Sequence, residues 1–173
     1  TASKLAELLT DETKFRAALT SMNCLHNPLG EGVHIIIKVF EETPRLRTLC
    51  GFEEGVEQID WSKSQKGPVE VALLAADLKA GRAIGAINLL TLDSTGNMRD
   101  QKTYTLTAGE EKIDLSQKNL GSADVTLLTA WLQRPEVTGA VDAVAIGGNP
   151  ITSAGGATLL ETIKTSKLKT IDI

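Results

Sequence analysis

The sequence of 173 residues predicts an α/β fold built from tandem repeats. Three observations predict it. A spacing pattern of apolar residues recurs along the chain, a helical pattern follows several of its copies, and two long stretches are duplicated. Self-similarity at a period of about 20–50 residues is typical of repeat proteins, in which each unit stacks on the next.

The apolar pattern is clearest in its first copy, where Leu19, Met22, Cys24, Asn27 and Leu29 follow the spacing L-x-x-L-x-L-x-x-N-x-L. From Val56 onward the copies start at intervals of 26–31 residues, which indicates five to six repeats in all. The further copies hold, in chain order, Leu46 and Leu49 (degenerate); Val56, Ile59 and Trp61; Ile84, Ile87 and Leu89; Glu110, Ile113 and Leu115; Val141, Val144, Ile146, Asn149 and Ile151; and Leu168, Ile171 and Ile173.

Helical patterns follow four of the copies. Apolar residues recur three and four positions apart, as on one face of an α-helix, in the ranges 33–40, 69–78, 125–132 and 159–163. Gly67 and Gly121 mark turns into two of these helices, and Pro68 suits a first helical turn. Gly81 stands where the second helix should end.

Two longer duplications support the repeat. The stretch from Val56 aligns without a gap with the stretch from Glu110, and both carry Glu, Ile, Asp and Ser in one frame. The stretch from Ala18 aligns with the stretch from Ala140, including an Asn-Pro pair in each. Neither alignment is expected by chance.

These residues resemble the leucine-rich repeat family, specifically its long-repeat, ribonuclease-inhibitor-like class, and are similar to the tandem repeats of many protist and algal proteins. The best matches are 19–29 and 141–151, and the resemblance covers nearly the whole chain outside 92–109. It implies a solenoid with short parallel strands on the concave side and helices on the convex side. In the family, the Asn of the pattern hydrogen-bonds backbone groups in the turn after the strand. The middle copies carry Ser64, Leu92 and Lys118 there, so we expect irregular turns.

Three segments depart from the repeat. Residues 1–18 are interpreted as an N-terminal helical cap or the helix of a preceding repeat, and 19–173 as the solenoid. Residues 92–109 are an insertion, a loop or short hairpin in place of a helix. It is either a solvated connector or a partner contact, with Tyr104 as the candidate. Residues 168–173 form an incomplete last repeat with an exposed sheet edge, so we expect the chain to continue or a partner to dock there.

The composition excludes several classes of protein. With a net charge of −4, the chain lacks the excess of basic residues that binds nucleic acid or an anionic membrane. No stretch reaches the roughly 18 apolar residues of a membrane span. With 42% hydrophobic and 3% aromatic residues, the core must consist of aliphatic side chains. Cys24 and Cys50 are expected to be buried thiols. They favour an intracellular protein, cytoplasmic or organellar, and a chloroplast if a targeting peptide was removed.

No catalytic, cofactor-binding or metal-binding set is recognisable. His26 falls in a turn of the repeat and His34 on a helix, and the chain has no H-E-x-x-H, C-x-x-C or G-x-S-x-G motif. We therefore predict that the protein is not an enzyme and needs neither cofactor nor metal.

The repeat frame predicts which strand residues point outward on the concave side. The acids among them are Glu57, Asp60, Glu111, Asp114, Asp142 and Asp172, and the bases are Arg47, Lys112 and Lys169. A central column should run through Asn23, Cys50, Asp60, Asn88, Asp114, Ala145 and Asp172. Two interpretations stay open, and both could hold. The column is a hydrogen-bonded Asn/Asp ladder that stabilises stacking, or it is a site for a basic partner.

The leading functional hypothesis is a non-catalytic leucine-rich-repeat module that binds another protein through this acidic face. The alternative is a structural subunit of a large, possibly organellar, assembly. An enzyme is the least favoured hypothesis, because a fold alone does not imply chemistry.

Overall fold

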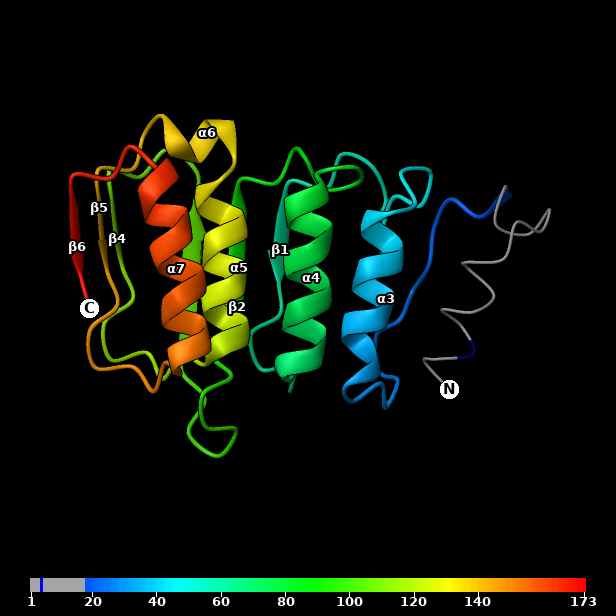
Figure 1. Ribbon diagram of the computed structural model, residues 1–173, viewed down its shortest axis with the longest axis horizontal. Helices are drawn as coiled ribbons and strands as arrows, with labels where there is room; N and C mark the ends of the chain where they lie inside the picture. The colour runs from blue at the N-terminus through cyan, green and yellow to red at the C-terminus, as the bar shows by residue number, and fades with distance from the viewer. Residues whose placement is uncertain (1–3, 5–17) are drawn as a thin grey trace.

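A computed structural model describes residue 4 and residues 18–173 (Figure 1). The prediction for residues 1–18 therefore lies almost entirely outside the described residues. The described helices are α3 (Gly32–Glu41), α4 (Pro68–Ala80), α5 (Ser122–Leu132), α6 (Pro135–Thr138) and α7 (Ser153–Thr165). The strands are β1 (Gln58–Asp60), β2 (Leu89–Asp93), β3 (Thr103–Thr107), β4 (Lys112–Asp114), β5 (Ala143–Ala145) and β6 (Thr170–Asp172). The predicted α/β class is confirmed.

The chain forms two layers. Helices α3, α4, α5 and α7 stand side by side in one layer, and the strands lie behind them (Figure 1). All four helical ranges predicted from the apolar spacing fall within these four helices. Helices α4, α5 and α7 each lie in the crossover between two parallel strands, which is how parallel strands are joined in one sheet.

The strands form two sheets of three in the described part of the chain. In the first, β1 pairs parallel with β2, and β2 pairs antiparallel with β3. In the second, β4, β5 and β6 are all parallel. Residues 92–109, the predicted insertion, contain the end of β2 and all of β3, which pair as a hairpin, and β3 forms an edge of the first sheet.

The same turn follows four of the strand segments. His26, Lys63, Gln117 and Gly148 have φ angles of 60°, 57°, 54° and 71°, and each stands at the same distance after its strand. Non-glycine residues adopt this left-handed region rarely. Its recurrence at one position of the sequence repeat shows that these copies share a backbone conformation as well as an apolar spacing.

The asparagine of the pattern bonds to this turn. Asn27 donates to the carbonyl oxygen of Cys24 at 3.1 Å, and Asn149 donates to that of Ile146 at 2.5 Å. Ser64 replaces the asparagine in its copy, and its hydroxyl donates to the equivalent carbonyl of Trp61 at 2.5 Å. The turn at Ser64 therefore keeps the same bond with a different donor.

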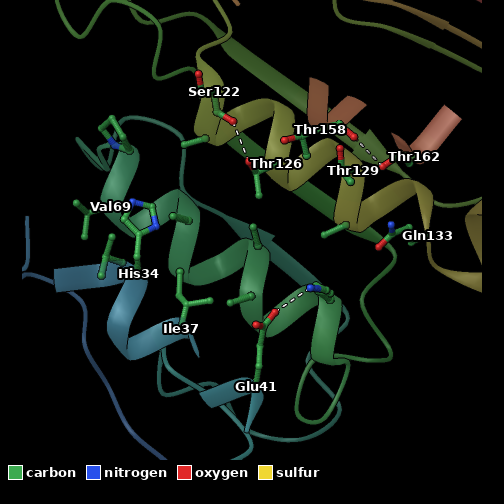
Figure 2. A pocket seen from close by; sticks show the side chains of 18 of the residues that line it. His34, Ile37, Glu41, Val69, Ser122, Thr126, Thr129, Gln133, Thr158 and Thr162 are labelled. Atoms are coloured by element: carbon green, nitrogen blue, oxygen red, sulfur yellow. Dashed lines mark hydrogen bonds and ion pairs between the residues drawn. The ribbon is translucent and has the colours of Figure 1, made fainter. Parts of the chain in front are cut away.

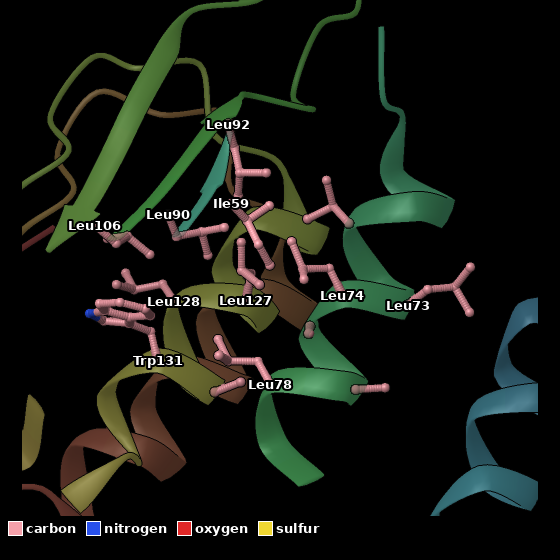
Figure 3. Close-up of a cluster of buried hydrophobic side chains, with 14 of the residues drawn as sticks. Ile59, Leu73, Leu74, Leu78, Leu90, Leu92, Leu106, Leu127, Leu128 and Trp131 are labelled. Atoms are coloured by element: carbon pink, nitrogen blue, oxygen red, sulfur yellow. The ribbon is translucent and has the colours of Figure 1, made fainter. Parts of the chain in front are cut away.

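The core is aliphatic, as the low aromatic content requires. Ile59, Leu90 and Leu106 from the strands point to the inner faces of α4 and α5 (Figure 3). Trp131 on α5 is fully buried there, and Trp61 is half-buried and stacks on Phe52 with ring centroids 6.0 Å apart.

The frame of the copy that starts at Ile84 is corrected by the strand register. Ile59 pairs with Leu90, so Leu90 takes the slot assigned to Ile87. The mistake has a physical cause. Strand β2 is extended by the hairpin and buries both Leu90 and Leu92, whereas Ile87 is buried in the turn that precedes it.

Substitutions at two glycines test helix propensity and turn geometry separately. A Cβ atom at Gly156, inside α7, would meet no atom within 4 Å, so Gly156→Ala is expected to stabilise the protein by about 0.5–1 kcal/mol. At Gly148 the Cβ would meet Gln117 at 3.0 Å and φ is +71°, so Gly148→Ala is expected to destabilise by about 1–2 kcal/mol. Urea unfolding measures both. Stabilisation by Gly148→Ala would contradict the repeated turn.

Candidate partner-binding face

The face of the two sheets turned away from the helices is termed the strand face. Side chains along each strand alternate between it and the core, because successive residues of a strand point to opposite sides. Its members are Gln58, Asp60, Leu89, Thr91, Asp93, Thr103, Thr105, Thr107, Lys112, Asp114, Ala143, Ala145, Thr170 and Asp172. Glu57 and Glu111 are exposed just before β1 and β4.

Part of the predicted central column is present. The register of the second sheet places Asp114, Ala145 and Asp172 in one row. Because neighbouring strands lie about 4.8 Å apart, the two aspartates are about 10 Å apart across the alanine. Asn23 and Cys50 are neighbours through an isolated bridge, but this bridge is antiparallel and so departs from the parallel column that the repeat predicts.

Two members of the column are corrected. Thr91, not Asn88, is the neighbour of Asp60, because the frame of the copy that starts at Ile84 is shifted. Asn88 is exposed before β2, where its backbone bonds to Glu57 and Ala108. Cys50 is buried at 4% exposure and does not reach the surface.

The carboxylates of the column bond locally. Asp60 accepts a hydrogen bond from the backbone N–H of Ser62 at 2.8 Å, and Asp114 accepts one from Ser116 at 3.1 Å. Asn23 bonds to Leu25 in the same way at 3.1 Å. These bonds close the turns after the strands and do not join neighbouring repeats. The interpretation as a ladder between strands is therefore wrong for these three residues.

The local bonds keep the two aspartates charged. Hydrogen bonds from Ser62 and Ser116 lower the pKa values of Asp60 and Asp114 below the usual value of 3.8. Both side chains are exposed, so the strand face carries fixed negative charges at neutral pH.

Two of the predicted bases are engaged by acids. Lys169 bonds to Asp142 at 2.6 Å, and Arg47 forms an ion pair with Glu54. Of the predicted acids, only Asp142 is held in one of these pairs. The strand face is therefore more acidic than the count of six acids against three bases suggests.

Tyr104 is not a surface contact. Its side chain is 3% exposed, and its hydroxyl donates to Asp124 at 2.9 Å. Burial and the nearby carboxylate raise the pKa of Tyr104 well above its usual value. The hairpin instead shows Thr105 to solvent, hydrogen-bonded to Thr91 across the strands at 3.2 Å. The alternation of threonine with large apolar residues along β3 is the sequence pattern that indicates the burial of Tyr104 and the exposure of Thr105.

The two histidines lie in different parts of the fold. His26 lies 2.7 Å from the ammonium of Lys66, whereas His34 lies on α3. Cys24 and Cys50 are free, buried thiols, as predicted, and burial raises the pKa of Cys24 to about 11. Among residue 4 and residues 18–173, no three His, Cys, Asp or Glu side chains are grouped to hold a metal ion.

Comparison of the chain with known protein families, with curated proteins and with solved structures finds no match. No helix in the described part of the chain is long and apolar enough to cross a membrane.

Proposed function

We propose that the chain is a leucine-rich-repeat solenoid that binds another protein through the strand face, without catalysis. The observation that carries the proposal is the acidic, helix-free face itself. Asp60 and Asp114 sit at equivalent places of duplicated sequence, each held charged by its own turn. A partner with a basic surface is complementary to such a face, and charge complementarity favours rapid, specific encounter.

The backbone supports the repeat interpretation. The left-handed turn recurs after four strand segments, and Asn149 also bonds to Leu115 and Leu120 of the preceding unit at 2.9 Å each. A rigid stack of units displays side chains at fixed intervals, and this suits recognition of an extended surface.

Charge reversal tests the proposed surface. Asp60→Lys together with Asp114→Lys is expected to weaken partner binding at least about tenfold, because two attractive charges become repulsive. Pull-down from native extract with mass spectrometry, using wild type and the double variant, identifies partners that depend on these residues. Glu42→Lys, an exposed charge change at the C-terminal end of α3 and away from the strand face, is the matched control and should retain them. Equal recovery by wild type and the double variant would rule out this face.

The second candidate function is a structural subunit of an assembly. Leu160 on α7 is 52% exposed, and Met98, in the loop between β2 and β3, is 45% exposed. Exposed large apolar side chains are features that a partner subunit covers. Light scattering distinguishes the two functions, since a stable monomer of the full chain argues for the binding module.

A further inference from the structure

A small cavity lies where α4 and α5 end. It has a volume of about 160 Å³ and is lined by the last turns of these two helices, the loop at Gly85 and the first residues of α6. It adjoins a larger groove of about 860 Å³ on the outer side of the helix layer, bordered by α3, α4, α5 and α7 (Figure 2). Lys79, Ala130 and Gln133 line both. The strand face lies on the far side of the sheets, so the cavity is a separate surface.

Arg134 brings a buried positive charge to this cavity. The residue is 7% exposed, and its guanidinium lies over the ring of Trp131, 4.7 Å from the ring centroid. Its Nη2 donates to the carbonyl oxygens of Gly85 and Ile87 at 3.0 and 2.6 Å. Its Nη1 is buried and has no hydrogen-bond partner among the described residues. Because an arginine keeps its charge inside a protein, these donors leave a positive charge that is incompletely compensated.

Arg82 shows how a second arginine in a similar setting is satisfied. It also follows the end of a helix, and its guanidinium lies over the ring of Phe40 at 4.6 Å. Its Nη1 donates to three carbonyl oxygens, those of Phe40, Thr43 and Leu46, at 2.7–3.1 Å. Of these two arginines, Arg134 is therefore the one whose Nη1 lacks acceptor oxygens in the described part of the chain.

The acid beside Arg134 does not supply such an acceptor. The carboxylate of Glu136 lies 3.9 Å from Nε of Arg134, beyond hydrogen-bond distance, and the Glu136 side chain is 54% exposed. Burial lowers the pKa of Arg134 below its usual value, because desolvation outweighs the attraction of Glu136. Lys79, a second cation that lines the cavity, already bonds to Glu41 at 2.8 Å. The surroundings of Arg134 therefore favour a ligand with a single negative charge.

The size and walls of the cavity limit the ligand further. A cavity of about 150 Å³ holds one benzene molecule, so a ligand of roughly six heavy atoms fits a volume of this order. Leu78, Ala130 and Pro135 contribute apolar atoms to the walls. A planar carboxylate matches the planar guanidinium, and a short hydrocarbon chain matches the walls.

We propose that this cavity binds a small monocarboxylate, with its carboxylate on the guanidinium of Arg134 and a short hydrocarbon chain against the apolar walls. The ligand carboxylate takes the place of the Glu136 carboxylate, whose exposed side chain turns toward solvent. Hydrogen bonds between arginine and a carboxylate are charge-assisted, and they are about twice as strong as those between neutral groups. Binding here does not depend on the function of the strand face.

Titration with butyrate tests the proposal. Butyrate has the required size and charge, and butanamide has a similar shape without the charge. The chain has two tryptophans, so Trp61→Phe leaves Trp131, beside the guanidinium, as the fluorescent reporter. Butyrate should produce a saturable change in Trp131 emission, and calorimetry on the wild-type chain should give the same affinity. Butanamide and inorganic phosphate should each bind at least about tenfold more weakly.

Variants locate the binding. Arg134→Lys should weaken butyrate binding at least about tenfold, because an ammonium lacks the planar fork that holds carbonyl groups and a carboxylate together. Glu136→Gln removes the competing charge at an exposed position and should strengthen binding at least about threefold. Arg82→Lys, the same change in the arginine at Phe40, is the matched control and should bind like wild type.

Four results would overturn the proposal. They are no saturable binding of butyrate, equal binding of butanamide or phosphate, equal affinity in Arg134→Lys, and unchanged or weaker binding in Glu136→Gln. If butyrate does not bind, water is the remaining occupant of the cavity, since buried water often satisfies such donors.

Discussion

Replacing Asp124 by alanine is expected to destabilise the protein by about 3 kcal/mol or more. This carboxylate is 1% exposed and accepts from the N–H and hydroxyl of Thr95, the N–H of Gly121 and the hydroxyl of Tyr104. It therefore holds the hairpin insertion to the first turn of α5. The substitution would leave several buried donors unsatisfied, at about 1–3 kcal/mol each before relaxation. Urea unfolding of both proteins measures the loss.

Glu70→Ala provides the matched control. Glu70 stands at the equivalent position of α4 and caps only the N–H of Gly67, at 3.0 Å. Because it is half-buried and satisfies one donor, its loss should cost about 1 kcal/mol. Equal costs for the two substitutions would contradict the role of Asp124 in holding the hairpin.

The cost of removing Asp124 should depend on pH. Burial raises its pKa above the usual 3.8, and the hydrogen bonds that it accepts limit the rise. A folded-state pKa above the unfolded value means that the native protein binds the proton more tightly. The stability contributed by this group is therefore fully present below about pH 3.8 and declines as pH rises through the folded pKa. Asp124→Ala should accordingly cost more in acid than at neutral pH.

Replacing Asp77 by alanine is expected to cost about 2–4 kcal/mol, because it frees three donors of the irregular second copy. The carboxylate of Asp77 accepts from the hydroxyl of Thr48 at 2.6 Å and from the N–H groups of Leu49 and Cys50 at 2.7 and 3.0 Å. This helix side chain thus satisfies backbone donors next to the bridge between Asn23 and Cys50. Hydrogen exchange at Leu49 and Cys50, together with urea unfolding, measures the effect.

An exposed acid is the control for Asp77. Asp142→Ala removes only the pair with Lys169, whose two side chains are 50% and 73% exposed, and should change stability by less than about 1 kcal/mol. If Asp77→Ala left the exchange rates of Leu49 and Cys50 unchanged, the proposed anchor would be wrong.

The helices and most strands were predictable because their signals are local. The apolar spacing located α3, α4, α5 and α7 and aligned β4, β5 and β6. The register of β2 was not predictable, because Ile84, Ile87, Leu90 and Leu92 offer two apolar frames and only the hairpin partner selects between them.

The candidate site was predictable in part. Asp60, Asp114 and Asp172 lie on the exposed face, because strand alternation fixes the side to which they point. The burial of Tyr104 depends on Asp124, 20 residues further along the chain, and no local pattern shows that pairing. The groove on the helix layer depends on how four helices stand relative to one another, which the spacing within one helix does not determine.

An NMR titration of the ¹⁵N-labelled full chain tests directly whether the strand face is the partner-binding surface. An unstructured lysine-rich peptide is the ligand and a glutamate-rich peptide of equal length is the control. Binding at the strand face should shift the amide signals around Asp60, Asp114 and Asp172 with the lysine peptide alone. Shifts that avoid these residues, or equal shifts with both peptides, would contradict it.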